Sequence, residues 1–241
     1  MHLLLTSLLL LPVPSTPTRR SVGELWAELR QVEAALERRP EQQAQWRRFA
    51  DEEGLSDAAF SDYVKVRLAF ELTRDGGLWG LRWHITNRAP DSKAIWAQWA
   101  AASAPGPSEA APVTATAECD ELSALFSLVA WKLGVEKVGL FWPTSNHTVA
   151  VWTAPTPGGS ARIVVPTSQI FLDPDQTLGT DAFDPYTQRT IYPYHGSGDV
   201  SDDLMLPEGL VDWMLARAPD AALDPETLQR QRNARAAQQR R

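Results

Sequence analysis

The feature that most constrains the fold is the stretch from Thr116 to Asp175, which combines one cysteine, one helix pattern and three strand patterns. Cys119, the only cysteine of the chain, stands just before an apolar run with helical spacing that closes at Gly134. The three strand patterns cover residues 138–142, 147–152 and 162–166. The stretch therefore predicts a cysteine at a helix N-terminus, packed beside an antiparallel sheet whose middle strand begins at His147.

This order suggests chemistry at the thiol. A thiolate is the nucleophile, and the unpaired N–H groups and dipole at a helix N-terminus lower the pKa of a thiol. A histidine beside Cys119 would hold the thiolate as an ion pair and then protonate a leaving amine, which makes His147 the candidate partner. A third polar side chain on the neighbouring strand would orient the imidazole.

The arrangement of Cys119, its helix and the strand that begins with His147 resembles the transglutaminase-like branch of the papain-like cysteine enzymes, over roughly residues 115–180. The family has cysteine, histidine and aspartate in that order on a helix, a strand and the next strand. Phe171 to Pro174 is similar to the hydrophobic-Asp-Pro ending of the family, so the resemblance implies Asp173 as the third catalytic residue. It also implies an α+β fold with a papain-like core and a helical N-terminal part.

Strand pairing leaves the third position open. If Thr153 and Ala161 flank the hairpin loop, the residue opposite His147 falls near Thr167, and a bulge would bring Ser168 or Gln169 there instead. Asp173 reaches His147 only if the chain folds back after Thr167. We favour Asp173 slightly, with Gln169 and Thr167 as alternatives, because neutral polar residues orient the histidine in some papain-like enzymes.

The chain divides into four predicted regions: a signal peptide at 1–18, a helical region at 21–104, the transglutaminase-like domain at 115–218 and a polar tail at 224–241. Ser21 is the expected cap of a first helix that stops at Pro40. A second helix is expected to end at Gly54, and a third to run from Ser56 to Gly76. We expect these helices to cover the catalytic half.

The N-terminus predicts export to the periplasm or the extracellular space. Leu3 to Leu11 is an apolar run of signal-peptide length, and small residues follow it, although no Lys or Arg precedes it. The run is too short to span a bilayer, so no stable membrane insertion is expected if it is cleaved. An uncleaved anchor and a wrongly assigned start, with a cytoplasmic protein, are the alternatives. The excess of arginine over lysine hints at a GC-rich bacterial source.

Charge and composition exclude several function classes. The net charge of -7 gives no general attraction to nucleic acid. A Gly-rich nucleotide motif and a second cysteine are both absent, so no cofactor and no metal are expected. The sequence therefore predicts a thiol enzyme that cleaves or transfers a peptide or amide acyl group through a Cys119 acyl-enzyme, with cell-wall peptides as substrates if exported. The alternative is an inactive domain of the same fold that binds a peptide or protein.

Overall fold

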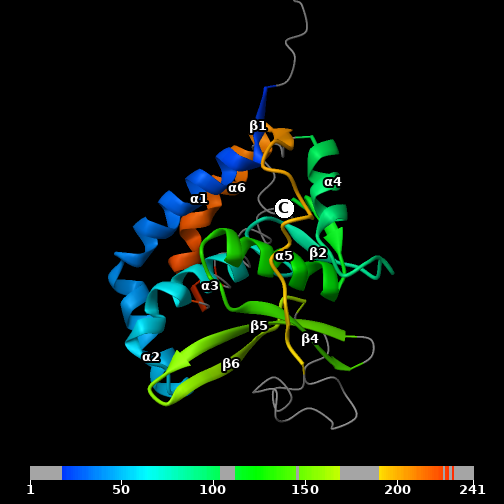
Figure 1. Ribbon diagram of the computed structural model, residues 1–241. Helices are drawn as coiled ribbons and strands as arrows, with labels where there is room; N and C mark the ends of the chain where they lie inside the picture. The colour runs from blue at the N-terminus through cyan, green and yellow to red at the C-terminus, as the bar shows by residue number, and fades with distance from the viewer. Residues whose placement is uncertain are drawn as a thin grey trace, which may run out of the picture.

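A computed structural model describes residues 18–103, 112–144, 147–168 and 190–224, together with Glu226, Thr227 and Arg230. The fold is α+β: helices gather on one side of a four-stranded sheet, and α5 runs between them and the sheet (Figure 1). The predicted Gln169 and Asp173 lie outside the described residues, as do the signal-like segment and most of the C-terminal tail.

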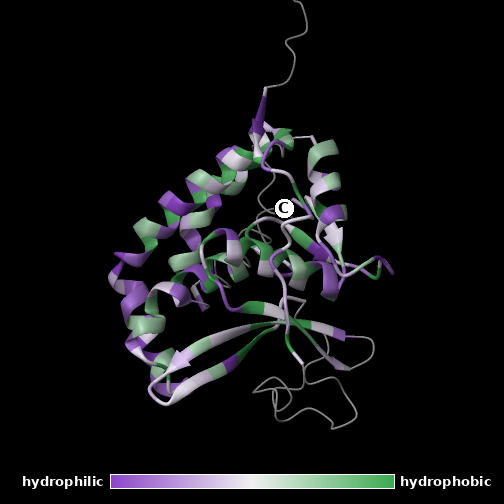
Figure 2. Ribbon diagram, in the orientation of Figure 1, coloured by the Kyte–Doolittle hydropathy of each residue, from purple (hydrophilic) through white to green (hydrophobic). Residues whose placement is uncertain are grey.

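Helix α1 (Val22–Glu37) begins as the sequence predicts. Ser21 Oγ accepts the N–H of Glu24 at 3.2 Å, and the Glu24 carboxylate accepts the N–H of Ser21 at 2.7 Å, which makes a capping box. The predicted apolar face is buried, including Leu25 and Leu29 at 0% exposure. Along α1, hydrophilic and hydrophobic residues form alternating bands (Figure 2), as expected of a helix with one face on the core.

Two further helices follow, and the first of them ends where the sequence predicts. Helix α2 (Pro40–Glu53) starts on a proline and ends at Gly54, whose φ of 64° is a left-handed cap that favours glycine. A short 3-10 turn, Asp57–Ala59, leads into α3 (Phe60–Thr73). The predicted end of α2 is confirmed, whereas α3 is shorter at both ends than the predicted helix from Ser56 to Gly76.

Helix α5 (Cys119–Lys132) is central to the core, and every residue from Glu121 to Ala130 is buried. The helix packs on α3 and on the sheet, and Gly134, with φ of 99°, follows its end. The prediction of a helix that starts at Cys119 and stops at Gly134 is confirmed.

The sheet has the strand order β6-β5-β4-β7 and is antiparallel throughout. Its strands are β4 (Val138–Thr144), β5 (His147–Thr156), β6 (Gly159–Val165) and β7 (Tyr192–Pro193). The hairpin register differs by one residue from the prediction, because Thr153 pairs with Arg162 and not with Ala161. The loop closes on Thr156 and Gly159, so the turn is tighter than its Pro and Gly content suggests.

The two faces of β5 belong to different apolar clusters. Ala150, Trp152 and Ala154 join the main core under the helices. Val149 and Val151 pack with Phe141 in a smaller cluster. Since side chains alternate along a strand, the small cluster lies on the face away from α5.

Segments far apart in the chain close the fold. Strand β1 (Arg19–Ser21) pairs antiparallel with β8 (Met205–Pro207), which leads into α6 (Glu208–Arg217). Strand β2 (Leu81–Trp83) pairs in parallel with β3 (Ala115–Ala117), beside α4 (Lys93–Ala101). One hydrophobic core joins the helical region to the sheet, with Trp79, Trp96 and Trp99 buried in it.

Within the described part of the chain, no helix has the length and apolarity needed to cross a membrane.

Candidate functional site

Cys119 is the first residue of α5 and is half-buried. The first N–H groups of a helix lack a carbonyl partner one turn back, and here side chains supply one, since the N–H of Glu121 donates to Asp120 Oδ1 at 2.8 Å. The N–H of Asp120 donates to Cys119 Sγ. The sequence pattern thus placed the only cysteine correctly at a helix start.

The thiol also meets the strand that carries His147. The N–H of Thr148, the residue after His147, donates to Cys119 Sγ. One helical turn along α5, Ser123 Oγ donates to the Thr148 carbonyl at 3.3 Å. Both backbone polar groups of Thr148 are therefore bound by α5 side chains four residues apart, on one face of the helix.

The sheet geometry explains why Thr148 is open to the helix. The N–H of Thr153 donates to Lys137 O, on the β4 side of β5. Because the N–H groups of successive residues in a strand point to alternate sides, the N–H of Thr148 points to the β6 side. The β5–β6 ladder ends at the pair Ala150 and Val165. Beyond that pair the start of α5 takes the place of β6 beside Thr148.

The predicted lowering of the thiol pKa is wrong in direction. Burial raises the pKa of Cys119 above its ordinary value of 9.0, and the carboxylates of Asp120 and Glu118 raise it further. The N–H groups of Thr148 and Asp120 lower it, but not enough to compensate. In this state Cys119 is a neutral thiol at neutral pH.

His147 is 8% exposed, and burial lowers the pKa of its imidazole below 6.5. Its Nε2 is buried without a hydrogen-bond partner. Among the hydrogen bonds of the described residues none joins the imidazole to Cys119 Sγ. The expected thiolate–imidazolium pair is therefore not formed here, and both groups are neutral.

Strand alternation adds a constraint on this pair. His147 has the same parity along β5 as Val149 and Val151, whose side chains lie on the face away from α5. The thiol touches the β6 edge of the strand at Thr148. The thiol thus meets β5 at Thr148, one residue after His147, whereas the imidazole lies on the opposite face of the strand.

One of the three candidates for the third position is described. Thr167 Oγ1 lies 3.0 Å from Ser123 Oγ, on the α5 side of the sheet. Thr167 and Ser168 follow the β5–β6 ladder in a turn, where the N–H of Thr167 donates to Val165 O at 3.0 Å, so the predicted pairing of Thr167 with His147 is not formed. Both residues are buried, at 1% and 3% exposure.

A group of carboxylates anchors a loop at the start of α5, which sequence reasoning missed. Glu118 accepts the N–H groups of Thr86 and Asn87, at 2.8 and 3.1 Å. Glu121, fully buried, accepts the Thr86 hydroxyl at 2.6 Å and Arg88 Nη1 at 3.2 Å. The spacing of Glu118 and Glu121 around the cysteine was the available signal, since a residue three positions into a helix often bonds back to the cap.

Asp120 lies between these two glutamates and has an unusual pKa. Burial, and then the charges of Glu118 and Glu121, raise the pKa of its carboxyl to about 6, against the N–H of Glu121, which lowers it. Asp120 therefore titrates near neutral pH, beside the thiol.

In the described ranges, no cluster of three or more His, Cys, Asp or Glu residues is arranged to hold a metal ion.

Comparisons with protein-family models, with curated proteins and with solved structures find no match to this chain.

Proposed function

We propose that the protein is a thiol enzyme of transglutaminase-like type, with Cys119 as nucleophile and His147 as base. The observation that carries the proposal is the hydrogen bond from Thr148 N–H to Cys119 Sγ, because it brings the helix start and the histidine strand into contact. The buried, unpartnered Nε2 of His147 supports it, since an unpaired imidazole nitrogen is a ready proton acceptor. The papain-like core itself belongs to this proposal.

The pKa directions favour a general-base route. Burial keeps the thiol of Cys119 protonated and the imidazole of His147 neutral, so no ion pair exists before substrate arrives. As the sulfur attacks a carbonyl carbon, its proton passes to Nε2 of His147. This step needs a rotation of the imidazole toward the β6 edge, because the resting structure does not join the two groups.

The remaining steps follow from acyl-transfer chemistry. The tetrahedral oxyanion takes over the N–H of Asp120, which donates to Cys119 Sγ before the attack. The intermediate collapses with loss of the C–N bond, and His147 gives its proton to the departing amine. Water or a second amine then attacks the thioester on Cys119, and the thiol is regenerated.

The proposal keeps Asp173 as the residue that orients His147, with Gln169 as its alternative. Thr167 is the weakest of the three, because its hydroxyl is already bound to Ser123. An Asp173→Asn variant with unchanged stability should lose activity if this assignment holds. The substrates that we propose are peptides or proteins, with cell-wall peptides among them if the chain is exported.

The test is acylation of the thiol by p-nitrophenyl acetate, followed by intact-protein mass. We expect an acetyl thioester in the intact protein, none in Cys119→Ala, and acylation slower by roughly a hundredfold in His147→Asn. His195→Asn is the matched control, because His195 is exposed and packs on Trp131, at the end of α5 opposite to Cys119. Equal acylation rates in His147→Asn and His195→Asn would refute His147 as the base.

A non-catalytic, peptide-binding domain is the second candidate. The observation that favours it is the parity of His147, which directs its side chain away from α5. Iodoacetamide separates the two. The binding domain is supported if Cys119 reacts no faster than it does in the unfolded chain and His147→Asn leaves the rate unchanged at every pH. The enzyme is supported if the rate depends on His147.

A further inference from the structure

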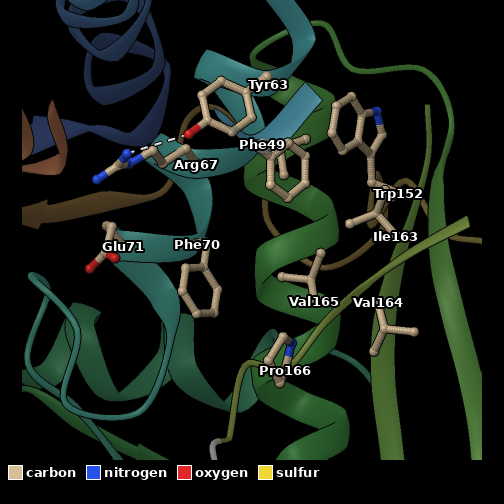
Figure 3. A pocket seen from close by; sticks show the side chains of 11 residues that line it. Phe49, Tyr63, Arg67, Phe70, Glu71, Trp152, Ile163, Val164, Val165 and Pro166 are labelled. Carbon is tan, nitrogen blue, oxygen red and sulfur yellow. Dashed lines mark hydrogen bonds between the residues drawn. The ribbon is translucent and has the colours of Figure 1, made fainter. Parts of the chain in front are cut away.

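An apolar slot of about 300 Å³ lies between α3 and the sheet, where β6 forms its edge (Figure 3). Aromatic rings from the helices form one wall, and residues of β5 and β6 form the other. The residues used below are Phe49, Phe70, Trp152, Ile163, Val164 and Val165. The volume is at the lower end of the range for ligand pockets, about 300–1,000 Å³, and suits one or two large side chains.

The slot lies on the helix side of the sheet and extends to the edge strand, β6. Ile163 and Val165 pack on the helix side, in the main core. Val164 packs with the small cluster on the other side. Because Val164 lines the slot together with Ile163 and Val165, the slot borders the backbone of the edge strand.

The outer backbone of β6 is available at this edge. Ile163 is paired with Trp152, whose N–H faces β6, so Ile163 bonds to β5 and its neighbours Arg162 and Val164 turn their N–H and C=O outward. Among the described residues, none donates to or accepts from the backbone of Arg162 or Val164. An edge strand with unpaired groups is a template for another strand.

From one end of the slot the chain leads to α5. Pro166 lines its end, and the next residue, Thr167, contacts Ser123 at 3.0 Å. Ser123 is one turn along α5 from Cys119, and both side chains bind the backbone of Thr148. A chain that follows the β6 edge toward Pro166 therefore runs toward the thiol.

We propose that the β6 edge binds an extended peptide as an added strand, with one bulky apolar side chain in the slot. This defines the substrate class of the proposed enzyme and rests on that proposal for its catalytic consequence. Backbone hydrogen bonds at Arg162 and Val164 supply affinity, and the slot supplies the side-chain preference.

The structure favours a peptide of apolar character over a charged ligand. In Figure 3 the charged groups of Arg67 and Glu71 point away from the β6 wall of the slot. Arg67 already donates to Tyr63 Oη and to the Leu223 carbonyl. The rings of Phe49, Phe70 and Trp152 remain to contact the ligand. The unpaired N–H and C=O groups of β6 require a partner with its own backbone donors and acceptors.

The experiment is fluorescence anisotropy with the full chain in a Cys119→Ala background, so that the probe is not consumed. The probes are fluorescein-labelled peptides Lys-Thr-Val-X-Val-Thr-Lys, with X as Phe, Leu or Trp, and a Gly control. We expect saturable binding of at least one apolar probe, weaker by about tenfold for Gly. Val164→Pro should weaken binding at least as much, because it removes an outward N–H but none of the bonds to β5.

Val164→Ala is the matched control, since it shortens the same side chain and keeps the N–H; thermal melts must show both variants folded. Equal binding by the Pro and Ala variants would overturn the proposal, as would absence of binding to all apolar probes. A dimer that Val164→Pro dissociates would identify a second copy as the occupant and also overturn it. Peptide binding without acylation of Cys119 in the native chain would refute the proposed enzyme and leave the proposed peptide site at β6 standing. Acylation of Cys119 without peptide binding would refute the peptide site and leave the proposed enzyme standing.

Discussion

The first turn of α5 and the turns that follow it differ in the polarity of their residues. From Leu122 to Ala130 the helix is buried, mostly apolar, and surrounded by the core. The first turn carries a neutral thiol and two acidic residues, Asp120 and Glu121, and the acidic cap residue Glu118 precedes it; Glu118 and Glu121 bind a loop from the other half of the chain. The contrast shows that the body of α5 stabilises the fold. The first turn lowers the stability, because burying ionisable groups away from water is unfavourable.

The body of the helix should show the largest effect. Phe126→Ala deletes a fully buried ring, so we expect the free energy of unfolding to fall by about 3–5 kcal/mol. Urea unfolding measures this, with Gln31→Ala on the exposed face of α1 as control, where the change should stay within about 0.5 kcal/mol. A loss below about 1 kcal/mol for Phe126→Ala would contradict the assignment of stability to this part of α5.

Glu121 should have the next largest effect. Glu121→Ala leaves the Thr86 hydroxyl and the N–H of Glu118 without their acceptor, and we expect a loss of about 2–3 kcal/mol in the free energy of unfolding. Arg88→Ala is the comparison, because its side chain is 42% exposed and the loss should be at most about 1 kcal/mol. If the two variants lose the same amount, the buried carboxylate is not what holds the loop.

Asp120 should act in the opposite sense. Its folded pKa of about 6 exceeds the ordinary value of 3.8, so the stability that a neutral carboxyl gives is present below pH 4 and is lost as the pH rises to about 6. Asp120→Asn removes this loss. After allowance for partial exposure we expect a gain of roughly 1–2 kcal/mol at pH 7.5, shrinking as the pH falls toward 4.

Urea unfolding at several pH values checks this gain, and a gain that does not depend on pH would contradict the raised pKa. The same variant offers a second measurement at the thiol. The Asp120 carboxylate raises the pKa of Cys119, so the alkylation of Asp120→Asn by iodoacetamide should begin at lower pH than in the unaltered protein. An unchanged profile would mean that burial alone sets the pKa of the thiol.

Much of the secondary structure could be predicted from local signals. Ser21 with Glu24, Gly54 and Gly134 marked helix ends because capping and left-handed residues act within a few positions. The apolar run at 147–152 likewise predicted the strand β5. The pairing register did not follow, because the loop length between Thr156 and Gly159 depends on turn geometry that composition does not specify.

The candidate site divides in the same way. The sequence placed Cys119 at a helix start and His147 at a strand start, and the contact at Thr148 brings those two elements together. The state of the groups could not be predicted, because a pKa depends on burial and on charges from distant segments. The sequence pattern predicted an activated thiol, whereas the fold surrounds it with carboxylates and takes it out of water.

By itself, then, the sequence determined the elements and their order, since helix caps, apolar periodicity and turn residues act over a few residues each. Only the tertiary structure decided that β6 would be a free edge beside an apolar slot, that Glu118 and Glu121 would bind a loop more than thirty positions away, and that the thiol would be neutral. The physical reason is that burial, edge exposure and charge proximity are properties of packing between distant segments, which no local pattern contains.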